Sequence, residues 1–160
     1  MGLKAHAYVT QVRWTAADGE GTRSYRSYSR DHTIAASGKP EIAASSDPAF
    51  RGNRSRYNPE ELLVASLSSC HLLWYLYLCS VNGVRVVEYR DDASGTMEER
   101  EDGTAEFARV ELRPIVTIAP GNDRARALAL HHDAHRLCFI ARSVKFPVAV
   151  DARIEEAALP

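Results

Sequence analysis

The chain has 160 residues, of which 26% are charged, and its 20 basic and 21 acidic side chains leave a formal net charge of -1. That length is typical of one domain, and we expect a single domain over residues 1–160. The balanced charge excludes the strongly basic surface with which proteins bind nucleic acid or an acidic membrane, so we expect neither partner.

The N-terminal residues predict no export signal, because MGLKAHAYVTQVRW lacks a positively charged start followed by an apolar run. We therefore expect a cytoplasmic protein whose three cysteines lie in a reducing compartment. Three cysteines in such a compartment indicate free thiols, a metal site or redox chemistry rather than a structural disulfide framework.

The first 57 residues predict two strands and a long loop. Residues 5–15 and 22–36 are rich in aromatic and β-branched side chains, and a glycine-containing turn at 18–21 separates them. Residues 37–57 contain two glycines and two prolines, which predict a loop. At about 20 residues, such a loop in a compact domain is usually functional or disordered.

A long helix is predicted to follow, over the segment NPEELLVASLSSCHLLWYLYLC at residues 58–79. Asn58 is a good N-cap and a proline suits the first helical position. Glu60 and Glu61 match the positive end of the helix dipole, and Glu61 can close a capping box with Asn58. The Asn82-Gly83 pair predicts the end of the helix.

The second half of the chain predicts a hairpin, a helix and a final strand. Residues 84–98 and 104–120 have the composition of a long antiparallel hairpin around Asp102-Gly103. Residues 122–138 form the second predicted helix, and residues 144–154 the last strand. The predicted order is β-β-α-β-β-α-β, which indicates the α+β class with antiparallel sheets around two central helices.

The first helix is apolar enough to raise the question of a membrane. Leu62 to Cys79 carries no formal charge over 18 residues, which reaches the lower limit for a transmembrane helix. Its serines and His71 would need hydrogen-bond partners in lipid, so we expect a helix buried in protein. One sheet covers only one face of such a helix. The other face must pack against the second helix or against a second copy of the protein, and we therefore expect a homodimer.

The three cysteines differ in their predicted places. Nine positions separate Cys70 from Cys79 and put them on opposite sides of the helix, and we interpret Cys79 as a small buried hydrophobe. Taken by themselves, Cys70 and Cys138, the latter at the end of the second helix, are more readily interpreted as core cysteines than as reactive ones. A reactive Cys70 needs a nearby cation, because it lies in mid-helix away from the dipole. Arginines of the 37–57 loop are the nearest in sequence.

A metal site is an alternative. His131, His135 and Cys138 lie at i, i+4 and i+7 of one predicted helix, and Cys70 or His71 could supply a fourth ligand. Histidines in helices are more often surface or core residues, and no close pair of cysteines supports a zinc site. This pattern therefore leaves the metal site open without favouring it.

Several motifs together resemble the OsmC/Ohr family, the osmotically inducible and organic hydroperoxide resistance proteins. In the first half these are an apolar helix that starts NPEELL and carries a cysteine ten residues after its first glutamate, together with an early tryptophan and a GEGT turn at residues 19–22. In the second half they are AHRLC, a serine five residues later and a final strand through PV at 147–148. The resemblance spans nearly the whole chain and is closer to the OsmC branch.

The resemblance implies a thiol-dependent peroxidase that reduces organic hydroperoxides. Cys70 would be the peroxidatic cysteine, which is oxidised to sulfenic acid, and Cys138 would resolve it as a disulfide. Glu60 would pair with an arginine that orients toward the thiolate and the peroxide. Arg51 is the best match for this arginine, and Arg54 and Arg56 are the alternatives.

The resemblance also implies an intertwined homodimer that uses no metal or organic cofactor. A small dithiol or a lipoyl group on a protein would reduce it again. The apolar residues around Cys70 favour organic hydroperoxides over hydrogen peroxide as substrates. His71 departs from the Ohr pattern, where an aromatic residue tends to follow the cysteine. The alternative function is a non-catalytic dimer of the same fold that binds a small hydrophobic ligand or serves a stress response.

Overall fold

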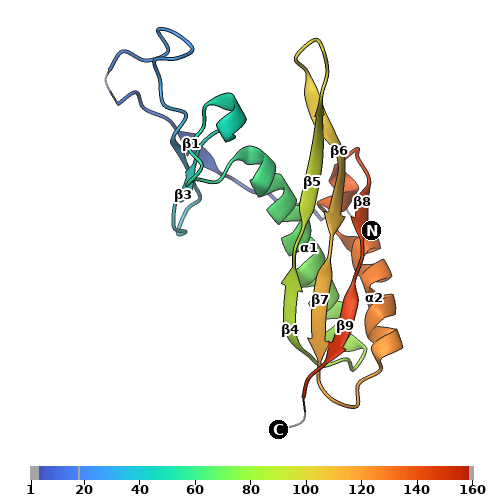
Figure 1. Cartoon of the computed structure of the whole chain (residues 1–160). Helices are drawn as coiled ribbons and strands as arrows, with labels where there is room; N and C mark the ends of the chain where they lie inside the picture. The colour runs from blue at the N-terminus through green and yellow to red at the C-terminus, as the bar shows by residue number, and fades with distance from the viewer. Residues whose placement is uncertain (1–3, 18, 159–160) are drawn as a thin grey trace. The chain divides into compact units, whose positions relative to one another are not determined.

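The computed structural model describes residues 4–17 and 19–158. The chain divides into two compact units, one ending at Leu62 and the other beginning at Leu63, and each is described by itself. The α+β class predicted from the sequence is confirmed (Figure 1). The prediction of a single domain stays a prediction, and Asp18 of the predicted first turn lies outside the described residues.

The first unit holds a small antiparallel sheet. Its strands β1 (Gln11–Arg13), β2 (His32–Ala35) and β3 (Ile42–Ala44) lie in the order β1-β2-β3, with Val12 opposite Ile34 and Ile34 opposite Ile42. The two predicted strands are thus shorter than 5–15 and 22–36. The predicted loop 37–57 also contains a strand and a 3-10 turn, η1 (Pro48–Phe50).

The second predicted strand is short because its aromatic residues pack locally. The guanidinium of Arg30 lies over the rings of Tyr25 and Tyr28, at 4.6 and 3.9 Å from their centroids. The Ser27 hydroxyl turns back to donate to the carbonyl of Ser24 at 3.0 Å. Cation–π stacking therefore holds these tyrosines in a turn, where the sequence pattern predicts an extended strand.

Helix α1 (Pro59–Val81) matches its prediction within two residues at each end. The capping box forms as expected: the Glu61 N–H donates to Asn58 Oδ1 at 2.8 Å, and the Asn58 N–H donates to Glu61 Oε2 at 3.1 Å. Gly83 ends the helix with a φ of 72°, a left-handed conformation that glycine adopts without strain.

The second unit carries a three-stranded ribbon that is broken in the middle. Its upper part has the order β5-β6-β8 and its lower part β4-β7-β9 (Figure 1). The strands are β4 (Val86–Asp91), β5 (Ser94–Glu99), β6 (Ala105–Leu112), β7 (Pro114–Ile118), β8 (Val148–Val150) and β9 (Arg153–Glu156). The predicted hairpin is present as β4/β7 and β5/β6. The final strand is split in two and pairs in parallel with β6 and β7, so the sheets are mixed rather than purely antiparallel.

The break in the ribbon has a local cause. Asp91 stands opposite Pro114, which has no N–H to give to the ladder. The preceding residue, Arg113, donates its N–H to the Asp91 carboxylate at 2.6 Å instead of to the neighbouring strand. Ser68 of α1 also donates to this carboxylate. Asp91 therefore ends one sheet and ties the break to the helix.

Both helices, α1 and α2 (Arg124–Leu137), pack on the ribbon and form its core. By length and composition α1 could also cross a membrane, a property that core helices of soluble proteins share. In this chain α1 buries one narrow stripe, at the i, i+4, i+8 and i+12 positions Leu67, His71, Tyr75 and Cys79. The predicted burial of Cys79 is thereby confirmed, and much of the remaining helix surface is open.

A buried pair of histidines joins the two helices. His71 Nε2 and His131 Nδ1 are 2.9 Å apart, and the two residues are 0% and 4% exposed. The ring of Tyr75 stacks on His131 at a centroid distance of 3.8 Å, and its hydroxyl donates to the Ala127 carbonyl of α2. Burial lowers the pKa of His71 to about 4, with a further contribution from nearby His135, and lowers the pKa of His131 to about 3.

We predict that the protein loses stability in mild acid because of this pair. Both folded-state pKa values lie below the ordinary value of 6.5. Between pH 6.5 and about 4 the unfolded chain therefore binds more protons than the folded chain. The free energy of unfolding, measured in urea, should fall on the order of a few kcal/mol over this window.

The double variant His71→Phe/His131→Phe keeps two stacked rings and removes the titration, and it should flatten this pH dependence. His132→Gln, at an exposed position of the same helix, is the matched control and should leave the slope as it is. An unchanged slope in the double variant would show that other groups cause the acid sensitivity.

Candidate functional site

The second unit brings two of the predicted site residues together. Cys70 lies on α1 and is half-buried, whereas Cys138 directly follows α2 and is 1% exposed. Burial raises the pKa of Cys138 to about 11, and the Cys70 thiol lies close enough to raise it further. The two sulfurs, 68 residues apart in the chain (138 minus 70), are thus neighbours in the reduced protein.

The sulfur of Cys138 also receives hydrogen bonds from the backbone. The N–H of Ala141, where the 3-10 turn η2 (Ala141–Ser143) begins, donates to Cys138 Sγ at 3.4 Å. The backbone of Ile140 contributes a second hydrogen bond, and both contacts favour negative charge on the sulfur. Cys138 is therefore a covered thiol with its own donors.

Aromatic side chains adjoin both cysteines. Trp74, one helical turn after Cys70, contacts Phe139 edge-to-face at a centroid distance of 5.3 Å, and Phe139 directly follows Cys138. Tyr77 packs on Trp74 in the same way at 5.8 Å. Phe139 is 65% exposed, so an apolar surface lies open beside the two sulfurs.

The first unit holds the predicted arginine in an ordered loop. Arg51 ends η1 with a φ of 66°, an uncommon conformation for a residue other than glycine. The next residue must be glycine, because a Cβ on Gly52 would lie 1.5 Å from the carbonyl oxygen of Ser46. Ser45 Oγ accepts the N–H of Asn53 at 3.1 Å, which closes the loop over this turn.

The three candidate arginines differ in their partners. Arg56 makes an ion pair with Asp31 at 3.1 Å and also donates to the His32 carbonyl. Although burial opposes it, hydrogen bonds and the charge of Arg56 hold the pKa of Asp31 below its ordinary value. Among the residues described, neither Arg51 nor Arg54 forms an ion pair with a carboxylate. The guanidinium of Arg51 lies 5.9 Å from the Tyr25 ring.

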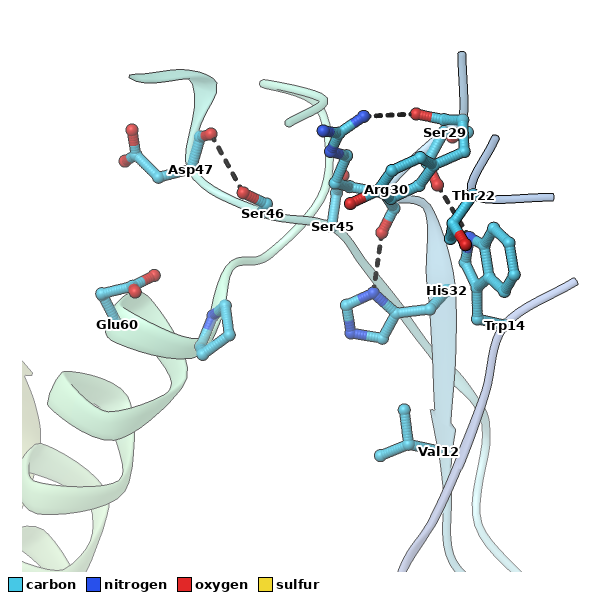
Figure 2. Close-up of a pocket in the computed structure, with 12 residues that line it drawn as sticks. Val12, Trp14, Thr22, Ser29, Arg30, His32, Ser45, Ser46, Asp47 and Glu60 are labelled. Atoms are coloured by element: carbon cyan, nitrogen blue, oxygen red, sulfur yellow. Dashed lines mark hydrogen bonds between the residues drawn. The ribbon is translucent and has the colours of Figure 1, made fainter. Parts of the chain in front are cut away.

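Glu60, the predicted partner of the arginine, belongs to the same unit. Its Oε2 atom is buried and has no hydrogen-bond partner within the described part of the chain. It lines a cavity of about 390 Å³, together with Asp47 and the side chains of the small sheet (Figure 2). The cavity's other lining residues are Val12, Trp14, Thr22, Tyr28, Ser29, Arg30, His32, Ser45, Ser46 and Pro59.

The predicted site residues thus fall into two sets. Cys70 and Cys138 adjoin each other in the second unit, and Arg51 and Glu60 both belong to the first. The sequence interpretation missed the cavity and the His71–His131 contact, whose partners are 60 residues apart and give no local signal.

The metal site left open by the sequence finds no support in this geometry. Within residues 4–17 and 19–158, no group of three or more histidine, cysteine, aspartate or glutamate side chains is arranged to hold a metal ion. His71 and His131 bond directly to each other at 2.9 Å, and each of His71, His131 and His135 has one buried ring nitrogen without a hydrogen-bond partner among the described residues.

Comparisons with known proteins agree with this fold. The family model of OsmC-like proteins matches residues 52–153, and no curated protein matches the chain. An OsmC-like protein of unknown function from Vibrio cholerae is 31% identical, with 93% of this chain and 100% of that chain covered, at a TM-score of 0.85.

Two more distant structures share the fold. An organic hydroperoxide resistance protein from Elizabethkingia anophelis is 20% identical over 96% of this chain and 100% of its own, with a TM-score of 0.65. A Legionella pneumophila protein described as an organic hydroperoxide resistance protein OsmC and predicted redox protein is 15% identical over 94% of this chain and 99% of its own, at 0.66. Since the family model spans most of the 160 residues and the Vibrio cholerae relative aligns over nearly all of them, the chain belongs to the OsmC/Ohr family.

Proposed function

We propose that the protein is a thiol-dependent peroxidase that reduces organic hydroperoxides with Cys70 and Cys138. The observation that carries this proposal is the adjacency of a half-buried and a covered thiol at the junction of the two helices. Membership of a family that includes proteins named for organic hydroperoxide resistance supports a redox role in stress defence.

The proposed cycle uses the two sulfurs in order. The Cys70 thiolate attacks the terminal oxygen of the hydroperoxide, the O–O bond breaks, and the alcohol leaves with a proton while Cys70 becomes a sulfenic acid. The Cys138 sulfur then attacks the Cys70 sulfur, and water leaves as the disulfide forms. A dithiol, either small or a lipoyl group on a protein, returns two electrons and restores both thiols.

Arg51 and Glu60 are the proposed activating pair. A guanidinium stays charged at every physiological pH, so it favours the thiolate and orients the peroxide. Arg51 fits this role because its guanidinium is not engaged with a carboxylate in the described residues, whereas Arg56 is bound to Asp31. The unpartnered buried oxygen of Glu60 supplies the charge that such an arginine needs.

The substrate class follows from the surface beside the sulfurs. Trp74 and Phe139 offer an apolar face that favours alkyl or aryl hydroperoxides over hydrogen peroxide. The protein is proposed to work in the cytoplasm, where reduced dithiols are present to recycle it. The alternative, a non-catalytic dimer that binds a small hydrophobic ligand, is favoured by the cavity of about 390 Å³ in the first unit.

A homodimer is proposed from the open face of α1. Leu73, Tyr77 and Val81 repeat at i, i+4 and i+8 and are 56–65% exposed, on the side of the helix opposite the buried stripe. Three large apolar residues in one exposed row are typical of an interface, and a second copy with the same row can cover them.

We predict that about one equivalent of cumene hydroperoxide removes two of the three free thiols and links Cys70 to Cys138. Thiol counting and peptide mass spectrometry measure both changes. Hydrogen peroxide should react more slowly, because it gains nothing from the apolar surface. Comparable rates with the two peroxides would contradict the proposed substrate class.

Two variants control this experiment. Cys79→Ser, at the core cysteine, should leave the disulfide unchanged, and Cys138→Ser should leave a sulfenic acid on Cys70 that dimedone traps. Slow oxidation without a Cys70–Cys138 link would refute the peroxidase and favour the ligand-binding alternative.

We predict that Arg51→Ala slows the oxidation of Cys70 by at least about tenfold, since a neighbouring opposite charge is worth about 1–3 pKa units. The pH midpoint of Cys70 alkylation by iodoacetamide should rise with it. Arg54→Ala is the matched control on the same loop and should change neither. If Arg54→Ala or Arg56→Ala produces the effect and Arg51→Ala does not, the assignment of the arginine is wrong.

We predict that sedimentation gives a particle of twice the chain mass of 17.7 kDa. Leu73→Asp/Tyr77→Asp should shift it toward the monomer, because each charge would be buried in the interface. Glu101→Ala, at an exposed turn of the second unit, should leave the mass unchanged. A wild-type monomer at micromolar concentration would contradict the dimer.

A further inference from the structure

The two sulfurs of the proposed disulfide differ in how a reductant can reach them. Cys138 is 1% exposed and contacts the turn that follows it, whereas Cys70, on α1, is half-buried. Thiol–disulfide exchange requires an approach to the attacked sulfur in line with the S–S bond, so access decides which sulfur is attacked. Of the two cysteines, Cys70 is the more accessible in the single chain.

The sulfurs also differ in their backbone donors. Cys138 Sγ accepts the N–H of Ala141 at 3.4 Å and a second backbone hydrogen bond from Ile140. Cys70 lies in the middle of α1, where the backbone N–H groups are already bonded to carbonyls one turn earlier. Negative charge that develops during exchange is thus better accommodated on Cys138 by the local backbone.

Burial opposes this preference, because it raises the pKa of Cys138 to about 11 and makes its thiolate a poorer leaving group. The raised pKa of Cys138 does not, however, make its covered sulfur accessible to a reductant. A reductant that attacked Cys138 would first have to displace the turn at residues 138–143, which is tied by the Arg142 N–H to the Cys138 carbonyl at 3.1 Å. Access to the sulfurs and the backbone donors at Cys138 therefore both favour attack on Cys70 with Cys138 as the leaving group.

We propose that the reductant attacks the sulfur of Cys70 and that Cys138 leaves as a thiolate held by the N–H groups of Ile140 and Ala141. The inference rests on the proposed function, since it concerns the disulfide formed in that cycle. It specifies which of the two sulfurs the reductant attacks when the disulfide is reduced, which the family relationship and the comparisons do not give.

The step balances with a dithiol as the reductant. Its thiolate forms a bond to Cys70 Sγ as the Cys70–Cys138 bond breaks, and the bonding electron pair passes to Cys138 Sγ. The second thiol of the reductant then attacks its own bound sulfur and releases the Cys70 thiolate. The reductant leaves oxidised as a cyclic disulfide, having given two electrons, and its two protons end on Cys70 and Cys138.

The test locates the mixed disulfide with a thiol that cannot complete the second step. In a Cys79→Ser background, diamide forms the Cys70–Cys138 disulfide without any peroxide. Glutathione is then added, the reaction is quenched in acid within seconds, and free thiols are alkylated. Peptide mass spectrometry should find glutathione on Cys70 and the alkyl group on Cys138. Glutathione on Cys138, or equal amounts on both, would overturn the proposal.

A second measurement does not depend on trapping that intermediate. Cys138→Ser and Cys70→Ser, each in the Cys79→Ser background, are converted to mixed disulfides with thionitrobenzoate. Glutathione is then added and early samples are quenched in acid, because attack on the protein sulfur leaves glutathione on the protein, whereas attack on the outer sulfur leaves a free thiol. Glutathione should appear on Cys70 at least about tenfold faster than on Cys138, because Cys70 is the more accessible residue. Equal or faster transfer to Cys138 would overturn the proposal.

The proposed peroxidase activity and the proposed site of reductant attack can be refuted independently of each other. The hydroperoxide titration tests whether the protein is a peroxidase and uses no glutathione. The exchange experiments start from a disulfide made by diamide or dithiobis(nitrobenzoate), so their outcome reports only on which sulfur is attacked.

Discussion

The hydrogen bond between His71 and His131 is the contact on which the proposed chemistry depends. It joins α1 to α2 in the core, one residue after Cys70 and seven residues before Cys138. Tyr75 reinforces the junction through its ring on His131 and its bond to the α2 backbone. The contact pairs one nitrogen of each buried imidazole, while His71 Nδ1 and His131 Nε2 have no hydrogen-bond partner among the described residues.

The junction also explains why an imidazole stands beside a thiol in the most apolar segment of the chain. Consecutive residues of a helix point about 100° apart, so when His71 turns into the core, Cys70 is directed toward its edge. A half-buried position at the edge suits the proposed peroxidatic sulfur of Cys70, while the proposed resolving sulfur of Cys138 can stay covered. The position of His71 in the core thus fixes the direction in which Cys70, the proposed reactive residue, points.

Local signals predicted the elements they control. Asn58 caps the first helix as predicted, the structure has Asp123 as the cap of the second, and both helices begin within two residues of the expected positions. The break in the sheet escaped prediction because it depends on Asp91 meeting Pro114 across two strands. The His71–His131 pair escaped for the same reason: spacing along one helix suggested a metal ligand or a surface residue, and the true partner lies on the other helix.

The sequence predicted which residues form the candidate site more fully than it predicted how those residues are arranged. The resemblance to the OsmC/Ohr family supplied Cys70 and Cys138, but it carried no information on which sulfur is covered. That asymmetry arises from the turn after α2, where two backbone donors face Cys138. A single arrangement can then serve both halves of a redox cycle. In the proposed cycle, the Cys70 sulfur exchanges atoms with oxidant and reductant in turn, and the covered Cys138 sulfur only gives and takes back the electron pair of the S–S bond. Such a division of roles protects Cys138 from direct oxidation, because an oxidant must reach Cys70 first.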